Sequence, residues 1–244
     1  MILKLALDIG NTFIKWGLRH DGAWLNQGSI PTQDIHLVLP LLNSYHPQAL
    51  YVANVSSKRF NQRLHEMSAP LKIATFYLTG ESQLAPLINC YDKPQELGVD
   101  RWLSLFAARQ RLQGSVLVVN SGTATTIDAL NHDHRFLGGI IIPGLTMMTR
   151  ALHVGTANLP WVTGKADTWP KNSANALTRG AIDATVGAIM ERHKQFIKES
   201  DGSSISLILS GGNAPLISPH LSLPHQGVEH LTLQGLGYYI DQHS

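Results

Sequence analysis

The sequence has 244 residues, of which 43% are hydrophobic and 15% are charged, so a disordered chain is excluded and one large or two small domains can form a core. The formal net charge is +2 with no long basic run, which argues against a nucleic-acid partner. Cys90 is the one cysteine, and no stretch reaches the roughly 18 to 20 apolar residues that span a bilayer. We therefore expect a cytoplasmic protein without an internal disulfide and without membrane contact.

Strand and helix patterns alternate in the first half of the chain. Three short strands come first, and a His-Asp-Gly turn separates the second from the third. The helix that follows contains Pro40, which should interrupt or kink it. The predicted strands cover residues 2–9, 13–19, 23–30, 49–56 and 72–78, and the predicted helices cover residues 32–45, 58–68 and 100–114.

The second half repeats most of this order. It begins with three strands, continues with a helix and a loop rich in turn-forming residues, and then has a long amphipathic helix. Another strand follows, and residues 229–243 are expected to form a last strand and helix. The other predicted strands cover residues 115–121, 123–130, 135–144 and 205–212, and the helices cover residues 145–155 and 174–200.

The loops after the first strand of each half are nearly the same. "LDIGNT" at residues 7–12 aligns with "VNSGTA" at residues 119–124, which pairs Asp8 with Asn120 and Gly10 with Gly122. We therefore predict an α/β protein with two similar halves, residues 1–112 and 113–244. This pattern resembles the actin, Hsp70 and sugar-kinase superfold, in which two ribonuclease H-like halves grip a nucleotide in the cleft between them.

The first of these loops has the composition of a phosphate site. Gly10 lets backbone N–H groups approach a phosphate, and Asn11 and Thr12 add side-chain donors. Asp8 is suited to hold a magnesium ion directly or through water, and Lys15 is suited to reach a phosphate as a point charge. Taken alone, the stretch is equally typical of a plain β-hairpin turn, but the second copy favours two loops around one triphosphate.

The second loop and a later glycine pair complete the predicted ATP contacts. Gly122 offers close backbone approach and Thr123 offers a hydroxyl group. Gly211 and Gly212 follow a predicted strand and precede a predicted helix, which suits a contact with adenosine or ribose. When this glycine pair is considered alone, an ordinary strand-to-helix turn is the favoured interpretation.

Six motifs in order give a more specific resemblance. They are "DIGNT", "YDKPQELGVDRW", "GTATTID", "GGIIIPG", "TANLP" and "LSGGNA". Together they closely resemble the type III pantothenate kinases, including the Baf-like members of that family, over nearly the whole chain. The combination of "LGVDRW" with "GTATTID" is specific, whereas "DIGNT" alone would indicate only the superfold.

The resemblance implies the first step of coenzyme A synthesis, in which the γ-phosphate of ATP is transferred to the primary hydroxyl of pantothenate to give 4′-phosphopantothenate. It also implies Mg²⁺, a monovalent cation (K⁺ or NH₄⁺) and a homodimer. Two alternatives remain open, namely a kinase of another small hydroxy acid and a non-catalytic Baf-like accessory protein with a regulatory role. The presence of Asp8, Lys15, Asp100 and Arg101 argues against the second.

The same resemblance implies roles for residues around the start of one predicted helix. Asp100 matches the family's catalytic base, and Arg101 matches a residue near the pantothenate carboxylate. Tyr91 and the backbone of Gly98 and Val99 match the pantothenate pocket. An aspartate that orients a hydroxyl and an arginine that binds a carboxylate agree with phosphoryl transfer to a hydroxy acid. The residue pattern alone favours Asp100 as a helix cap, whereas the resemblance favours the base, and both roles can hold together.

Two positions depart from the family pattern. Ser173 lies where the family usually has a substrate-binding threonine, so the hydroxyl is kept and the methyl is lost. Asn120 stands where many members have an aspartate that helps to hold the monovalent cation, which predicts a shifted cation requirement and not an inactive enzyme. Residues 132–135, "HDHR", are expected to form a solvated turn in preference to a metal site, and the roles of Asp128 and His153 stay open.

Overall fold

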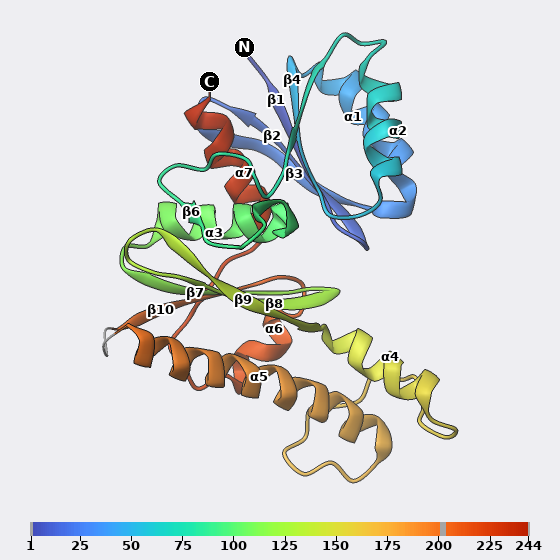
Figure 1. The fold of residues 1–244 in the computed structure, drawn as a ribbon. Coiled ribbons are helices and arrows are strands. Elements are labelled where there is room, and N and C mark those ends of the chain that lie inside the picture. The colour runs from blue at the N-terminus through green and yellow to red at the C-terminus, as the bar shows by residue number, and fades with distance from the viewer. Residues whose placement is uncertain (1, 201–203, 244) are drawn as a thin grey trace. The chain divides into compact units, whose positions relative to one another are not determined.

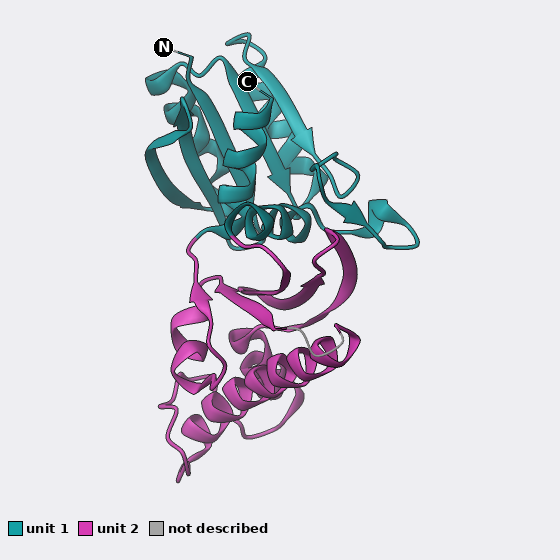
Figure 2. Cartoon of the chain, turned by 90° about the vertical axis from the view of Figure 1, so that its left-hand side faces the viewer, with its two compact units in different colours: residues 1–111, 230–244 teal, residues 112–229 magenta. Residues whose placement is uncertain are grey.

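The computed structural model describes residues 2–200 and 204–243, and the chain divides into two compact units. Unit 1 consists of residues 1–111 together with 230–244, and unit 2 consists of residues 112–229 (Figure 2). Each unit combines a β-sheet with helices, as expected for the predicted α/β class. Over the described ranges, none of the helices combines the length and the apolar character that crossing a bilayer requires.

The sheet of unit 1 has the strand order β3-β2-β1-β4-β5. Its strands are β1 (Lys4–Ile9), β2 (Phe13–His20), β3 (Ala23–Pro31), β4 (Ala49–Asn54) and β5 (Ala74–Leu78), and the short β6 (Ile88–Asn89) follows in the chain. The first three strands form an antiparallel meander, and β4 pairs in parallel with both β1 and β5. Asp21 and Gly22 have positive φ values of 44° and 75°, so the predicted His-Asp-Gly turn is a two-residue hairpin loop.

The two faces of this sheet have different partners. Unit 1 contains the helices α1 (Val38–Tyr45), α2 (Lys58–Ser68), α3 (Val99–Arg111) and α7 (Leu231–Gln242), with 3₁₀ turns η1 (Thr32–Leu37) and η2 (Pro94–Glu96). Leu5 and Leu7 of β1 pack in one core with Leu42 of α1 and Leu64 of α2. Because alternate residues of a strand point to opposite faces, Asp8 faces the other side, where α7 packs on β1 (Figure 1).

The helix predicted over residues 32–45 is divided into two parts. The 3₁₀ turn η1 bends at Asp34, with φ −97° and ψ 32°, and α1 begins at Val38. Pro40 lies in the first turn of α1, where its missing N–H removes no helical hydrogen bond. The expected interruption is therefore present, but the bend precedes the proline.

The helix α7 belongs to unit 1, although the sequence-based division placed it in the second half. Residues 231–242 form one helix, and the strand expected within residues 229–243 is absent, because the short β11 (Gln226–Gly227) ends before that range. Leu233 and Leu236 of α7 are fully buried, and the helix contacts β1, β2, β4 and α3. The Arg19 guanidinium of β2 donates hydrogen bonds of 3.1 and 2.5 Å to the Asp241 carboxylate, which fixes the end of α7. The burial of its apolar side chains thus places α7 in unit 1, although it follows unit 2 in the sequence.

Unit 2 repeats the three-strand meander. Its elements are β7 (Ser115–Ser121), β8 (Ala124–Leu130), β9 (Arg135–Pro143), α4 (Leu145–Gly155), α5 (Ser173–Glu199), β10 (Ile205–Ser210), α6 (Ala214–Ile217), η3 (Ser218–His220) and β11. Within the unit the strand order is β11-β10-β7-β8-β9. The long helix α5 covers one face of the sheet, where Ile189 and Phe196 pack with Leu117 and Leu207 (Figure 1). The predicted loop between α4 and α5 contains no helix or strand.

The helices α3 and α7 meet in close backbone contact. A Cβ atom on Gly235 of α7 would lie 2.2 Å from the carbonyl oxygen of Leu103 in α3. The contact partner is backbone, so it cannot move aside as a flexible side chain can. The absence of a side chain at Gly235 therefore sets the distance between the two helices.

Substitution Gly235→Ala should destabilise the protein by about 1–3 kcal/mol or more, because the added methyl group overpacks the helix contact. Thermal unfolding measures this as a lower Tm. The matched control is Gly187→Ala inside α5, where no atom lies within 4 Å of the added Cβ. That change should be neutral or stabilising by up to about 1 kcal/mol, since alanine has the higher helix propensity. Equal effects of both substitutions would contradict the close contact.

Candidate functional site

The loop after β1 is held in shape mainly by its backbone. The N–H of Gly10 donates to the carbonyl of Phe13 at 3.1 Å, and the N–H of Thr32 donates to the carbonyl of Thr12 at 3.0 Å. The hydroxyl of Thr32, a buried residue, donates to the carbonyl of Gly10 at 2.8 Å. Asn11 and Thr12 are exposed at the loop tip, so an anion in solution can reach their side chains.

Asp8 and Lys15 face each other across the hairpin that carries this loop. They are paired in the β1–β2 register, and Lys15 Nζ lies 3.8 Å from Asp8 Oδ2. Asp8 is only 6% exposed. Burial raises the pKa of its carboxyl group from 3.8 to about 6, with Lys15 opposing the rise and Asp100 adding to it. One ammonium group thus balances only part of the buried negative charge.

Asp100 lies in the first turn of α3, and its carboxylate turns back toward the start of the helix. Its Oδ1 accepts a hydrogen bond from the N–H of Arg101 at 2.8 Å. A Cβ atom on Gly98 would lie 2.6 Å from that oxygen, so the glycine leaves room for the carboxylate. Burial raises the pKa of Asp100, while Arg101 and Lys15 oppose the rise. Lys15 acts on both carboxyl groups, so the structure brings Asp8, Lys15 and Asp100 into one electrostatic cluster in unit 1.

Arg101 and Tyr91 are in direct contact. Arg101 Nη1 donates to the Tyr91 hydroxyl at 2.8 Å, and the guanidinium carbon lies 5.6 Å from the Tyr91 ring centroid. Arg101 and the neighbouring Val99 are both 5% exposed. A guanidinium held in this way is a pre-oriented donor for a carboxylate. The structure therefore brings together the residues of this segment for which the sequence predicted a substrate pocket.

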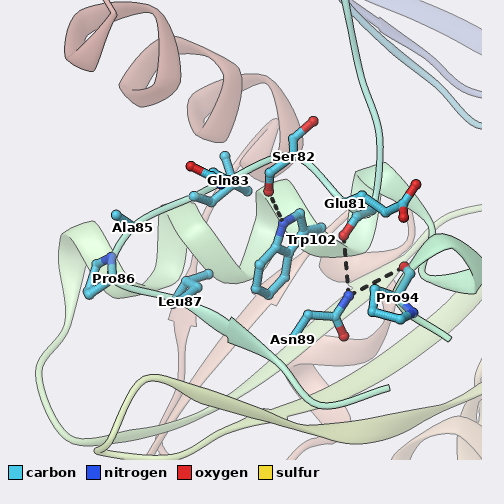
Figure 3. Close-up of a pocket in the computed structure, with 11 residues that line it drawn as sticks. Glu81, Ser82, Gln83, Ala85, Pro86, Leu87, Asn89, Pro94 and Trp102 are labelled. Atoms are coloured by element: carbon cyan, nitrogen blue, oxygen red, sulfur yellow. Dashed lines mark hydrogen bonds between the residues drawn. The ribbon is translucent and has the colours of Figure 1, made fainter. Parts of the chain in front are cut away.

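A pocket of about 410 Å³ lies in unit 1 beside the start of α3. It is lined by residues 80–87, Asn89, Pro94 and Trp102 (Figure 3). The Trp102 indole donates to the carbonyl of Ser82 at 2.8 Å. The side chain of Asn89 donates to the carbonyl of Gly80 at 3.2 Å and accepts from the N–H of Tyr91 at 3.0 Å. Asn89 thus ties the pocket wall to the backbone of Tyr91.

In unit 2, the two predicted glycine corners meet. The N–H of Asn213 donates to the carbonyl of Ser121 at 3.0 Å, and its side-chain amide donates to the carbonyl of Gly122 at 2.9 Å. Gly211 has a φ of +95°, and a Cβ there would lie 2.2 Å from the carbonyl oxygen of Ser121. Only glycine permits both this conformation and this approach. The corner after β10 is therefore packed onto the loop after β7.

The tip of this second corner is accessible. Thr123 is exposed, and no atom lies within 4 Å of a Cβ added to Gly212. Asn120, near the end of β7, pairs in register with Thr126 of β8 and Ser210 of β10. Side chains that carry oxygen therefore flank Asn120 along the sheet.

Sequence reasoning missed three residues that shape the two loops, namely Thr32, Gly144 and Asn213. A Cβ on Gly144 would lie 2.1 Å from the carbonyl oxygen of Gly122. Asn213 directly follows the predicted glycine pair, and this place in the sequence could have indicated that it shapes the loop. Thr32 and Asn213 bond residues 22 and 91 positions away in the chain, which no local pattern reveals.

The remaining candidates all lie in unit 2. Ser173 is the first residue of α5 in unit 2, whereas Asp100 belongs to unit 1. His153 has its Nδ1 2.7 Å from the carbonyl oxygen of Leu159 in an exposed segment. Residues 132–135 form a largely exposed hairpin turn, as expected, and Asp128 is buried within β8.

The chemistry of Asp8 fits the expected magnesium ion. Over residues 2–200 and 204–243, no group of three or more His, Cys, Asp or Glu side chains is placed to hold a metal. Magnesium with a nucleotide does not need such a group, because it is commonly held by one or two carboxylates, waters and phosphate oxygens. The pKa of the buried Asp8 carboxyl group stays raised although Lys15 opposes the rise, so a divalent cation beside Asp8 would stabilise its charged form.

Comparison with solved structures defines the fold. The chain resembles a Baf family protein from Campylobacter jejuni, with a TM-score of 0.64, 20% identity and coverage of 98% of both chains. It also resembles the Lmo2764 protein from Listeria monocytogenes (TM-score 0.60, 14% identity, 99% of both chains). A polyphosphate/ATP-glucomannokinase from an Arthrobacter strain gives a TM-score of 0.53 at 15% identity over 100% of both chains. The predicted actin, Hsp70 and sugar-kinase superfold is thereby confirmed.

Sequence comparison defines the family. The family model of type III pantothenate kinase matches residues 4–195. A type III pantothenate kinase from Dechloromonas aromatica is 38% identical over 95% of this chain and 96% of its own length. Another, from Thiobacillus denitrificans, is 34% identical over 96% of this chain and 94% of its own length. The chain belongs to the type III pantothenate kinase family, as its motifs predicted.

Substitution Asp8→Asn should stabilise the magnesium-free protein at neutral pH. Because the pKa of Asp8 is raised to about 6, the folded chain binds this proton more tightly than the unfolded chain, and stability is lost as pH rises from 3.8 through 6. The asparagine variant avoids this loss, so its stability should exceed that of the wild type by on the order of 2 kcal/mol at pH 7.5 and by much less near pH 4.5. Thermal unfolding at both pH values measures the difference.

The control for this experiment is Asp133→Asn, in the exposed turn between β8 and β9. Its Tm difference from the wild type should be small at both pH values, because an exposed carboxylate is solvated in both states. A Tm gain for Asp8→Asn that is the same at the two pH values would contradict the buried, raised-pKa carboxyl.

Proposed function

We propose that this chain transfers the γ-phosphate of ATP to pantothenate and forms 4′-phosphopantothenate, the first step of coenzyme A synthesis. The observation that carries the proposal is the cluster in unit 1, where the charge of Lys15 acts on the buried carboxyl group of Asp8 and on the half-buried Asp100. Membership of the type III pantothenate kinase family supplies the two substrates. Such a cluster suits phosphoryl transfer, which needs positioning and charge neutralisation more than covalent chemistry.

Asp100 serves in this proposal as the base that orients the acceptor hydroxyl. Burial raises its pKa toward the working pH, which makes the carboxylate a better proton acceptor. Arg101, which is held by the Tyr91 hydroxyl, binds the carboxylate of pantothenate. The backbone of Gly98 and Val99 forms the adjoining part of the substrate pocket. The two ends of a hydroxy acid are thus recognised by neighbouring residues of α3.

The loops of the two units bind the phosphates and the nucleoside. Carbonyl groups of these loops are engaged in internal hydrogen bonds, and Asn11, Thr12 and Thr123 are exposed at the loop tips, which supports their contact with a nucleotide. Lys15 adds a positive charge in unit 1. The proposed ATP contacts are Asp8, Gly10, Asn11, Thr12, Lys15, Gly122, Thr123, Gly211 and Gly212.

Two ions complete the proposed chemistry. Asp8 holds Mg²⁺ directly or through water, and the bound ion neutralises charge on the phosphate oxygens. The side-chain oxygen of Asn120 contributes to a site for a monovalent cation, K⁺ or NH₄⁺. The neighbouring hydroxyl-bearing residues Thr126 and Ser210 support an oxygen-rich environment there. Asparagine lacks the charge of the aspartate that is common at this position, so the cation should bind more weakly.

A homodimer in the cytoplasm is the proposed working form. Unit 2 exposes large apolar side chains on α4 and in the loop after it, including Val154 (75%), Trp161 (56%) and Trp169 (84%). Exposed apolar groups of this kind favour association with another protein surface, and a second copy of the chain is the partner that the family implies. Ser173 follows this loop and contributes a hydroxyl to a substrate site. A solution mass that is monomeric at assay concentrations would contradict the dimer.

A kinase assay with Asp100→Ala tests the function. The wild type should release ADP only when pantothenate is present, and loss of the base should lower kcat by about 100-fold or more without a large change in Tm. The matched control Asp133→Ala removes an exposed carboxylate and should leave kcat unchanged. ATP binding by the wild type without pantothenate-dependent ADP release would reject the function, and turnover that survives in Asp100→Ala would reject the base.

Substitution Asn120→Asp tests the cation proposal. The restored negative charge should add about 1 kcal/mol or more of attraction for K⁺. The K⁺ concentration that gives half-maximal activity should therefore fall by several-fold. Parallel titrations with KCl, NH₄Cl and NaCl, at constant ionic strength, measure the effect. An unchanged cation dependence would show that Asn120 takes no part in a cation site.

A further inference from the structure

Two buried hydroxyl groups converge on the backbone of Asp100. Ser104 Oγ donates to the carbonyl oxygen of Asp100 at 2.7 Å, across one turn of α3. Thr232 Oγ1, from α7, lies 3.4 Å from the same carbonyl oxygen and 3.1 Å from Ser104 Oγ. Ser104 and Thr232 are 1% and 3% exposed, so water is kept away from this triangle. All three residues belong to unit 1.

The number of hydrogen atoms determines how the triangle is bonded. Each hydroxyl has one hydrogen to donate. The short bond to the Asp100 carbonyl uses the hydrogen of Ser104. Thr232 must then donate to Ser104 Oγ, to the Asp100 carbonyl, or to both as a shared bond. In each arrangement the hydroxyl of α7 is linked to the first turn of α3.

Packing alone gives no reason for a hydroxyl at position 232. Its neighbours Leu231 and Leu233 are almost fully buried, and a valine would have nearly the same shape as the threonine. A buried hydroxyl is unfavourable unless it is hydrogen-bonded, so its presence here is explained by the bonds that it makes.

We infer that Ser104 and Thr232 are positioning residues that fix the Asp100 carbonyl, and with it the start of α3, so that the Asp100 carboxylate keeps its orientation toward substrate. The inference rests on the proposed role of Asp100 as the base. The carboxylate is only two bonds from the Asp100 Cα, so a rotation of the backbone at this residue displaces it directly. Displacement of a reacting group by about 1 Å can lower a rate on the order of 100-fold.

The test is a comparison of Thr232→Val with Thr232→Ser. Thr232→Val should lower kcat by about 10- to 100-fold and leave KM for ATP within about twofold, because the group that is misplaced acts on the acceptor hydroxyl. Thr232→Ser keeps the hydroxyl and should retain kcat within about threefold of the wild type. Ser104→Ala removes the shorter bond and should lower kcat in the same way, so it decides the matter if Thr232→Val does not fold.

The matched control is Thr185→Val in α5 of unit 2. Thr185 is also a fully buried threonine whose hydroxyl donates to a helix carbonyl, that of Ala181 at 2.9 Å. The substitution Thr185→Val should lower Tm about as much as Thr232→Val does, and it should leave kcat unchanged.

Three results would overturn the inference. The first is an unchanged kcat in Thr232→Val. The second is an equal loss of kcat in Thr185→Val and Thr232→Val. The third is a failure of both Thr232→Val and Ser104→Ala to fold. That result would show that Ser104 and Thr232 are needed for stability and not for the position of Asp100. A wild type without pantothenate-dependent turnover rejects the proposed function itself, whereas an active wild type with an equally active Thr232→Val rejects only the positioning.

Discussion

The constraint on which unit 1 depends is the burial of the Asp8 carboxyl group beside Lys15, next to the half-buried Asp100 and its neighbour Arg101. A buried charge is unfavourable unless it is paired, and Lys15 serves both Asp8 and Asp100. The surrounding structure must therefore hold these groups in place against their own tendency to be solvated. The β1–β2 register positions Asp8, and the packing of α3 against α7 positions Asp100. Perturbed carboxyl groups of this kind are typical of functional sites, where the energy is recovered when substrate and ion bind.

The two halves use the same loop motif but support it differently. In unit 1 a threonine side chain, Thr32, closes the loop from the end of the meander. In unit 2 the corresponding loop is held by Asn213 and by two glycines that allow backbone to pack on backbone. The loop of unit 2 has no counterpart of the buried Asp8, since Asn120 stands in its place. The two units therefore share the strand–loop–strand arrangement, whereas the carboxylate beside the loop is found only in unit 1 among these two positions.

Much of the fold could be predicted from the sequence, because the spacing of apolar residues in strands and helices reflects which side chains are buried. The two meanders, the hairpin turn at Asp21 and Gly22 and the long helix α5 follow from alternation, turn residues and helical periodicity. The assignment of α7 to unit 1 does not follow, because its leucines fit either half and only the packing against α3 selects one.

The candidate site was predictable to a similar degree. Asp8, Lys15 and Asp100 were identified from their motifs, but their mutual electrostatic influence depends on a contact between segments that lie far apart in the chain. The hydroxyl of Thr232 had no motif at all. Its role depends on a hydrogen bond to a residue 132 positions earlier, and neither periodicity nor composition contains this information.

The place of α7 in the chain has a consequence for biosynthesis. Unit 1 is interrupted by the whole of unit 2, residues 112–229, before α7 is reached. When the ribosome has made the strands of unit 1 and α3, the sheet face that carries Asp8 still lacks the helix that packs on it. A chain that stops short of α7 would expose this apolar face and leave the start of α3 without its partner. Unit 1 can therefore be completed only after translation has passed through the whole of unit 2.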